Sequence, residues 1–111
     1  MATSSSVKQT KRSLKLGQSE KYEDDEWWSW SVWVDGPAKE LDQVKQVEYT
    51  LHPTFSKPVR IVGTRRNNFK LSTGGWGVFP IYARILKKDG TVTRLRHNLE
   101  LHYPGGRRNT A

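Results

Sequence analysis

The sequence predicts an all-β fold, a small sandwich or barrel of six to eight short strands in a single domain. A chain of 111 residues leaves room for one hydrophobic core. Only 34% of the residues are hydrophobic, so the rings of five Trp, four Tyr and three Phe must supply much of the buried area. Aromatic and β-branched residues suit pleated surfaces, and turn signals separate short runs of alternating polar and apolar residues along the chain.

The first strand is expected in the segment Trp27–Val34. Alternate residues from Trp28 to Val34 are Trp, Trp, Val and Val, and the residues between them are Ser29, Ser31 and Trp33. This period of two places the apolar residues on one face of a strand. Asp35-Gly36-Pro37 ends the strand, and residues 38–43 are expected to form a short helical or irregular link.

Later segments repeat the pattern. Further strands are expected around Val47–Leu51, Val59–Val62, Phe69–Leu71, Phe79–Ile85 and Val92–Leu101. Asp89-Gly90 lies between the last two periodic runs and is typical of a tight hairpin turn. Tyr103-Pro104-Gly105-Gly106 is expected to end the folded part.

The two ends of the chain are expected to be tails. Residues 1–21 lack hydrophobic periodicity and contain five basic residues and one acidic residue, so they are interpreted as a disordered basic tail. Residues 104–111, with Arg107 and Arg108, are interpreted as a flexible tail, which leaves a nearly charge-balanced domain at 22–103. The formal net charge of +8 therefore sits mostly in the ends, where it favours weak, salt-dependent contact with nucleic acid or other polyanions.

Several classes of function find no support. The chain has no Cys and no apolar run as long as a membrane span, and residues 1–21 lack the apolar stretch of a secretory signal, so a cytoplasmic location is expected. No nucleophile turn or phosphate loop occurs. His97 and His102 are five residues apart at a strand end and project to opposite faces. No metal site, no cofactor and no enzymatic activity are expected.

Two segments carry more constraint than a turn requires. In the first, Pro53 and Pro58 stiffen the backbone on either side of Phe55. In the second, Gly75 and Gly77 flank Trp76 and leave it without bulky neighbours. These rings are either two further core aromatics or the walls of a binding slot at one end of the sandwich, because loops on a rigid scaffold commonly hold binding residues.

The two segments resemble the loops of a known family. Leu51-His52-Pro53-Thr54-Phe55, then Pro58, and Gly75-Trp76-Gly77-Val78-Phe79 are similar to the Leu-His-x-Ser/Thr-Phe/Tyr and Gly-Trp/Tyr-x-x-Phe loops of the YEATS domain family. The resemblance runs from about Trp27 to Leu101 and is closest to the prokaryotic branch. It implies an immunoglobulin-like antiparallel β-sandwich of about seven or eight strands and a non-enzymatic reader of acylated lysine.

The resemblance also implies roles for individual residues. Phe55 and Trp76 would sandwich a planar acyl-amide of the acetyl or crotonyl type, and Thr54 would hydrogen-bond the amide. The Trp76 backbone N–H would meet the acyl carbonyl, and His52 would orient the first loop.

Two more features complete the implied site. Gly75 and Gly77 would let the second loop approach the ligand, and a third aromatic wall falls at Glu26 or Trp27. The implied partner is an acylated protein or peptide. Alternative functions are a carbohydrate-binding sandwich with a flat row of Trp rings, a single-stranded nucleic-acid binder that uses exposed Trp, and an assembly domain whose loops pack against another protein.

Overall fold

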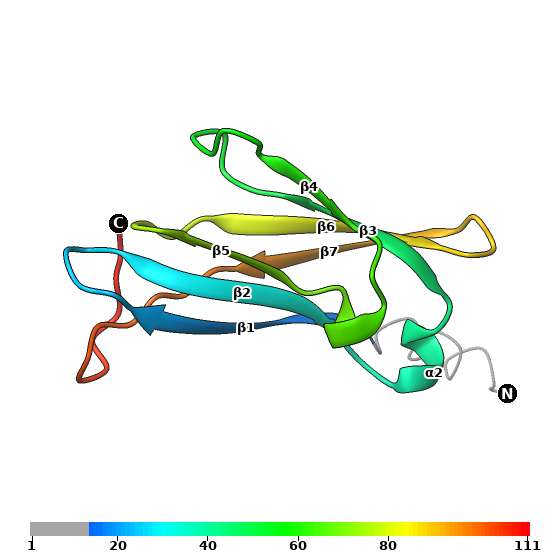
Figure 1. Cartoon of the computed structure of the whole chain (residues 1–111), viewed down its shortest axis with the longest axis horizontal. Coiled ribbons are helices and arrows are strands. Elements are labelled where there is room, and N and C mark those ends of the chain that lie inside the picture. Colours follow the sequence, from blue (N-terminus) through cyan, green and yellow to red (C-terminus); the bar gives the residue numbers. More distant parts are fainter. Residues whose placement is uncertain (1–13) are drawn as a thin grey trace, which may run out of the picture.

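Two antiparallel sheets pack face to face in the structure, a computed structural model that describes residues 14–111 (Figure 1). The first sheet has the order β1-β2-β5, formed by Lys15–Tyr22, Trp28–Asp35 and Leu71–Gly75. The second has the order β4-β3-β6-β7, formed by Val59–Val62, Val44–Thr50, Pro80–Lys87 and Val92–Asn98. One helical turn, α2 (Ala38–Leu41), connects β2 to β3, and a 3₁₀ turn, η1 (Arg66–Asn68), precedes β5. The expected all-β sandwich is confirmed.

The core lies between the sheets and follows the predicted alternation. In β2 the side chains of Trp28, Trp30, Val32 and Val34 are all buried. The facing sheet contributes Tyr49, whose hydroxyl donates a hydrogen bond of 2.7 Å to the Phe69 carbonyl. Burial raises the pKa of Tyr49 above its ordinary value, so this hydroxyl stays protonated as a donor.

The interpretation of residues 1–21 as a tail is wrong for its last part. Lys15–Tyr22 form β1, which pairs with β2 along its whole length. The sequence did not indicate this strand, because Gln18 and Glu20 place polar side chains on the same face as the apolar Leu16 and Tyr22. Gln18 bonds His97 and the backbone of Glu100, and Glu20 bonds His102 at 2.6 Å. Residues 1–13 lie outside the described part of the chain, and so does the tail assigned to them.

The C-terminal segment is also ordered, contrary to expectation. After a turn at Gly105 and Gly106, it runs back against the end of the first sheet, with a bridge between His102 and Arg108. The Asn109 side chain is buried, and its backbone N–H donates to the Leu101 carbonyl at 2.7 Å. A buried amide with these partners fixes the segment, whereas the sequence offered only polar residues after two glycines.

Two strand boundaries differ from the expected ones. Phe69 is buried but has a left-handed φ of 58° at the end of η1, so β5 begins at Leu71 and extends into the expected glycine loop as far as Gly75. The last strand ends at Asn98 rather than Leu101. The predicted hairpin turn is present, with Gly90 at φ 91°. None of the helices within residues 14–111 is long and apolar enough to cross a membrane.

Candidate functional site

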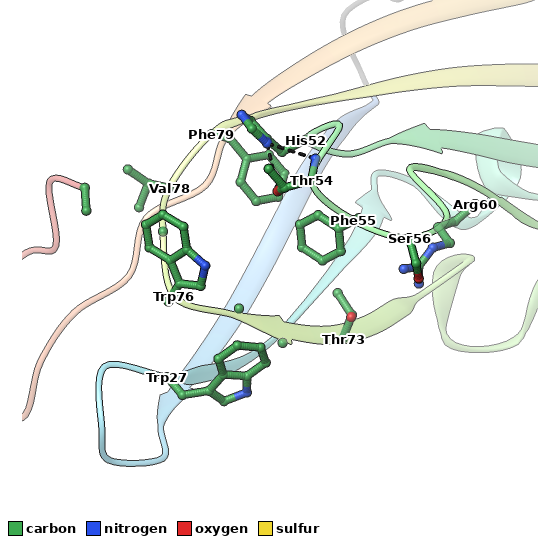
Figure 2. A pocket seen from close by; sticks show the side chains of 14 residues that line it. Trp27, His52, Thr54, Phe55, Ser56, Arg60, Thr73, Trp76, Val78 and Phe79 are labelled. Carbon is green, nitrogen blue, oxygen red and sulfur yellow. Dashed lines mark hydrogen bonds between the residues drawn. The ribbon is translucent and has the colours of Figure 1, made fainter.

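A cavity of about 450 Å³ opens at one end of the sandwich, between the β3–β4 loop and the β5–β6 connection (Figure 2). All of the residues expected at the site line it: His52, Thr54, Phe55, Gly75, Trp76 and Gly77. Trp27 lines it as well, from the turn before β2. The structure therefore brings three segments far apart in the sequence to one place.

The first loop is closed by its own backbone. The Leu51 N–H donates to the Pro58 carbonyl at 2.7 Å, and the Phe55 N–H donates to the His52 carbonyl at 3.0 Å. These bonds turn the Phe55 ring inward, where its centroid lies 5.5 Å from that of Phe79 and 6.3 Å from that of Trp30. The Trp30 contact is edge-to-face, an arrangement that stabilises ring pairs. The half-buried Phe55 ring thus forms one wall of the cavity and is held in place by the rings of Phe79 and Trp30.

The polar group of this loop is a His–Thr pair. Nδ1 of His52 lies 2.9 Å from the Thr54 hydroxyl oxygen and accepts a hydrogen bond of 3.2 Å from the Thr54 N–H. An Nδ1 that accepts from the amide carries no proton, so the Thr54 hydroxyl must donate to it as well. No donor to that hydroxyl oxygen is found within residues 14–111, so its lone pairs can accept a hydrogen bond from a group in the cavity.

The second loop carries the exposed indole of Trp76 next to the buried Gly75. Trp76 is 59% exposed. Gly75 is buried, and a Cβ at this position would lie 3.7 Å from both Phe55 Cζ and Trp30 Nε1. The absence of a side chain leaves the floor between Phe55 and Trp76 flat. Among the residues that the structure describes, no acceptor is found for the Trp76 backbone N–H.

Trp27 rather than Glu26 reaches the cavity. Glu26 accepts a hydrogen bond from the Tyr103 hydroxyl, whereas the Trp27 indole lies on Gly74, where a Cβ would come within 2.8 Å of its Nε1. Asp24, Asp25 and Glu26 all have positive φ in the turn that precedes it. Such a run costs about 1 kcal/mol or more per residue, and strained backbone of this kind concentrates at functional sites.

The lining also contains residues to which the sequence assigned no role at the site. Ser56, Arg60, Thr73, Val78 and Phe79 complete the wall, and Ala111 lies beside Gly77. Asn109 does not line the cavity but supports the second loop. Its Nδ2 donates a 2.8 Å hydrogen bond to the Trp76 carbonyl. The contact between Asn109 and Trp76 joins residues 33 positions apart, and nothing local in the sequence signals it.

Few charged side chains are found among the described residues of the cavity lining. Among the lining residues within 14–111, Arg60 is the one Lys or Arg, and none is Asp or Glu. His52 is paired with Thr54 and with no carboxylate in the described part of the chain. No group of three or more metal-ligating side chains is found within residues 14–111.

The carbohydrate alternative required a flat row of Trp rings on a sheet face. Trp28 and Trp30 are instead buried, and Trp33 packs over Gly17 on the outer face of the first sheet. Trp27 and Trp76 face the cavity from two different segments. The indoles therefore form no row, and that alternative loses the feature on which it depended.

Comparison with known proteins gives consistent matches. A family model described as prokaryotic YEATS domain matches residues 28–100. The "Protein AF-9 homolog" of Eremothecium gossypii is 33% identical over 78 residues, which are 66% of this chain and 36% of that protein. Its counterpart in Saccharomyces cerevisiae is 32% identical over the same length, with 34% of that protein covered. The chain thus spans about a third of the length of these relatives.

Solved structures agree with the sequence matches. A structure of the Yaf9 YEATS domain recognizing an H3K122suc peptide superimposes with a TM-score of 0.66 at 29% identity, covering 80% of this chain and 71% of that one. A second structure, of the Yaf9 YEATS domain bound to H3K27ac, has a TM-score of 0.63 at 25% identity, covering 81% and 70%.

Proposed function

The chain belongs to the prokaryotic YEATS domain family, and on that premise we propose that it is a non-enzymatic module that binds an acylated lysine side chain between Phe55 and Trp76. The proposal is supported by the Yaf9 YEATS domain, a similar domain for which complexes with the acylated peptides H3K122suc and H3K27ac have been solved. The partner proposed here is any protein or peptide that carries an acyl-lysine, without a commitment to histones.

One observation carries the proposal. Trp76 is a largely exposed indole that faces the half-buried Phe55 ring across a glycine floor, and the Thr54 hydroxyl lies beside them (Figure 2). Acylation removes the charge of lysine and leaves a flat, polar amide on an apolar stem. Rings above and below would cover the two faces of such an amide.

The edges of the amide need partners as well. In the proposed complex the Thr54 hydroxyl accepts from the amide N–H, and the Trp76 backbone N–H donates to the acyl carbonyl. A buried amide group without a partner costs about 1–3 kcal/mol, so these two bonds would distinguish acyl-lysine from an apolar chain of similar shape. Trimethyl-lysine keeps its charge and is best held in a cation–π cage.

The test is a titration of acetyl-lysine and crotonyl-lysine peptides followed by calorimetry. Trp76→Ala should weaken binding at least about tenfold, the scale of one lost aromatic contact. Trp33→Ala is the matched control, because it removes an indole from the outer face of β2. Equal affinities for the two variants would refute the slot. Trp76 is the better probe than Phe55, which also packs on Trp30 and Phe79.

The non-enzymatic part of the proposal has its own test. Prolonged incubation with an acyl-lysine peptide should leave the peptide mass unchanged, since the described cavity pairs His52 with a hydroxyl and not with a carboxylate that could orient it as a base. Release of the acyl group that scales with protein concentration would contradict it.

A further inference from the structure

Strand β4 has two apolar side chains on its outer face, whereas its inner face carries Arg60 beside the core residue Val62. Val59 and Ile61 point to solvent and are 49% and 61% exposed. Arg60, between them, is paired in register with the fully buried Tyr49 of β3 and therefore faces the inner side of the sheet. A sandwich strand normally turns its apolar residues inward. Departures from local pattern are expected chiefly at functional sites.

The inward direction of Arg60 leads into the cavity. Its guanidinium lies over the Phe55 ring, with Cζ 5.9 Å from the centroid, and it lines the cavity. Its Nε donates to the Lys57 carbonyl. The two terminal nitrogens make no hydrogen bond or ion pair within residues 14–111. In Figure 2 the Phe55 ring lies between Trp76 and Arg60, with Ser56 beside the guanidinium.

Protection of a sheet edge is the competing explanation. β4 is the edge strand of its sheet, and inward charges discourage edge-to-edge pairing. That role requires only a charge. It does not require a guanidinium stacked on a binding-site ring with Nε held by a backbone carbonyl. The fixed Nε leaves the two terminal nitrogens in the fork that pairs with a carboxylate through two parallel bonds.

We infer that Arg60 is a carboxylate-binding point beside the acyl-lysine slot, so that the preferred ligands carry a carboxylate on the Phe55 side of the site. The inference rests on the proposed function. The carboxylate can end the acyl chain itself, as in succinyl- or glutaryl-lysine, or belong to an Asp or Glu close to the acylated lysine. Both sources present the same anion to the guanidinium.

Two pairs of peptides on one neutral background distinguish these sources. Butyryl-lysine against glutaryl-lysine tests the acyl chain, and acetyl-lysine with a neighbouring Gln against the same peptide with Glu tests the flanking residue. Affinities are measured by calorimetry at one ionic strength for the wild type, Arg60→Gln and Arg60→Lys. Arg94→Gln is the matched control, because Arg94 is exposed on the outer sheet face and carries the same charge.

The carboxylate peptide of at least one pair should bind the wild type about tenfold more tightly than its neutral partner. This advantage should disappear in Arg60→Gln, fall in part in Arg60→Lys, which keeps the charge but loses the fork, and persist in Arg94→Gln. The pair that shows the advantage identifies the source of the carboxylate.

Other results separate the two proposals. Neutral acyl-lysine binding without a carboxylate advantage in either pair, or with an advantage that survives in Arg60→Gln or is lost in Arg94→Gln, overturns the Arg60 inference and leaves the slot intact. Failure of every acyl-lysine peptide to bind the folded wild type overturns the proposed function itself. Aggregation of Arg60→Gln together with a full carboxylate advantage in Arg60→Lys would assign Arg60 to edge protection alone.

Discussion

Replacing Gly74 by alanine should destabilise the domain and weaken acyl-lysine binding together. An added Cβ would lie 2.8 Å from Trp27 Nε1 and 2.9 Å from the Trp28 carbonyl oxygen. The exposed indole of Trp27 can swing away, which would remove it from the cavity. The carbonyl belongs to β2, which is hydrogen-bonded to β5, so both strands must shift. Overpacking of this kind costs about 1–3 kcal/mol, and 2 kcal/mol corresponds to a fall in Tm of roughly 8–16 °C for a domain this small.

Gly63→Ala is the control for that experiment. No atom lies within 4 Å of a Cβ built there, and the residue is not among those with positive φ. It should leave Tm unchanged or raise it. Alanine lowers the conformational entropy of the unfolded chain, and this effect stabilises the folded state by up to about 0.4–1 kcal/mol. Thermal melting by circular dichroism and peptide titration are the assays. Equal Tm values for the two variants would refute the close contact at Gly74, and a destabilised Gly74→Ala with wild-type affinity would exclude Trp27 as a wall.

Three further predictions concern single side chains. Asn109→Ala should lower the free energy of unfolding by about 1–2 kcal/mol and speed amide exchange around Trp76; unchanged exchange would show that the C-terminal segment does not support the loop. Thr54→Val keeps the side-chain shape but loses the acceptor, so acetyl-lysine affinity should fall about tenfold, and an unaltered affinity would remove Thr54 from the site. Burial lowers the pKa of His97, against a smaller opposite effect of Glu100, so the unfolded chain binds the proton first as pH falls. Stability should therefore decline from about pH 6.5 downward, and His97→Gln should flatten this decline in urea melts; identical pH profiles would contradict it.

Much of the framework was predictable because it depends on neighbours in the chain. Alternation from Trp28 to Val34 identified the buried face of β2, and Asp89-Gly90 identified the hairpin between β6 and β7. Pro53, Pro58 and the glycines around Trp76 also singled out the two loops, although the local pattern left Phe55 and Trp76 as either core aromatics or walls of a slot, and both rings line the cavity. These features depend on backbone geometry and on hydrophobic period, which a linear pattern records.

The remainder depends on partners distant in sequence. β1 places Gln18 and Glu20 inward, where they bond residues about 80 positions away, so its linear pattern resembles that of a polar tail. The role of Asn109 at the cavity likewise depends on a distant partner, the Trp76 carbonyl. Arg60 has an inward direction that follows from pairing with Tyr49, and β4 alone would be taken as apolar on the side of Val59 and Ile61.

The most direct test of the central claim is the position of the acyl group in the complex. Intermolecular nuclear Overhauser effects should connect the methyl protons of a bound acetyl-lysine peptide to the rings of Phe55 and Trp76, and the Trp76 amide resonance should shift on saturation. Contacts confined to another surface, such as the outer face of the β4-β3-β6-β7 sheet around Tyr82 and Arg94, would contradict the account.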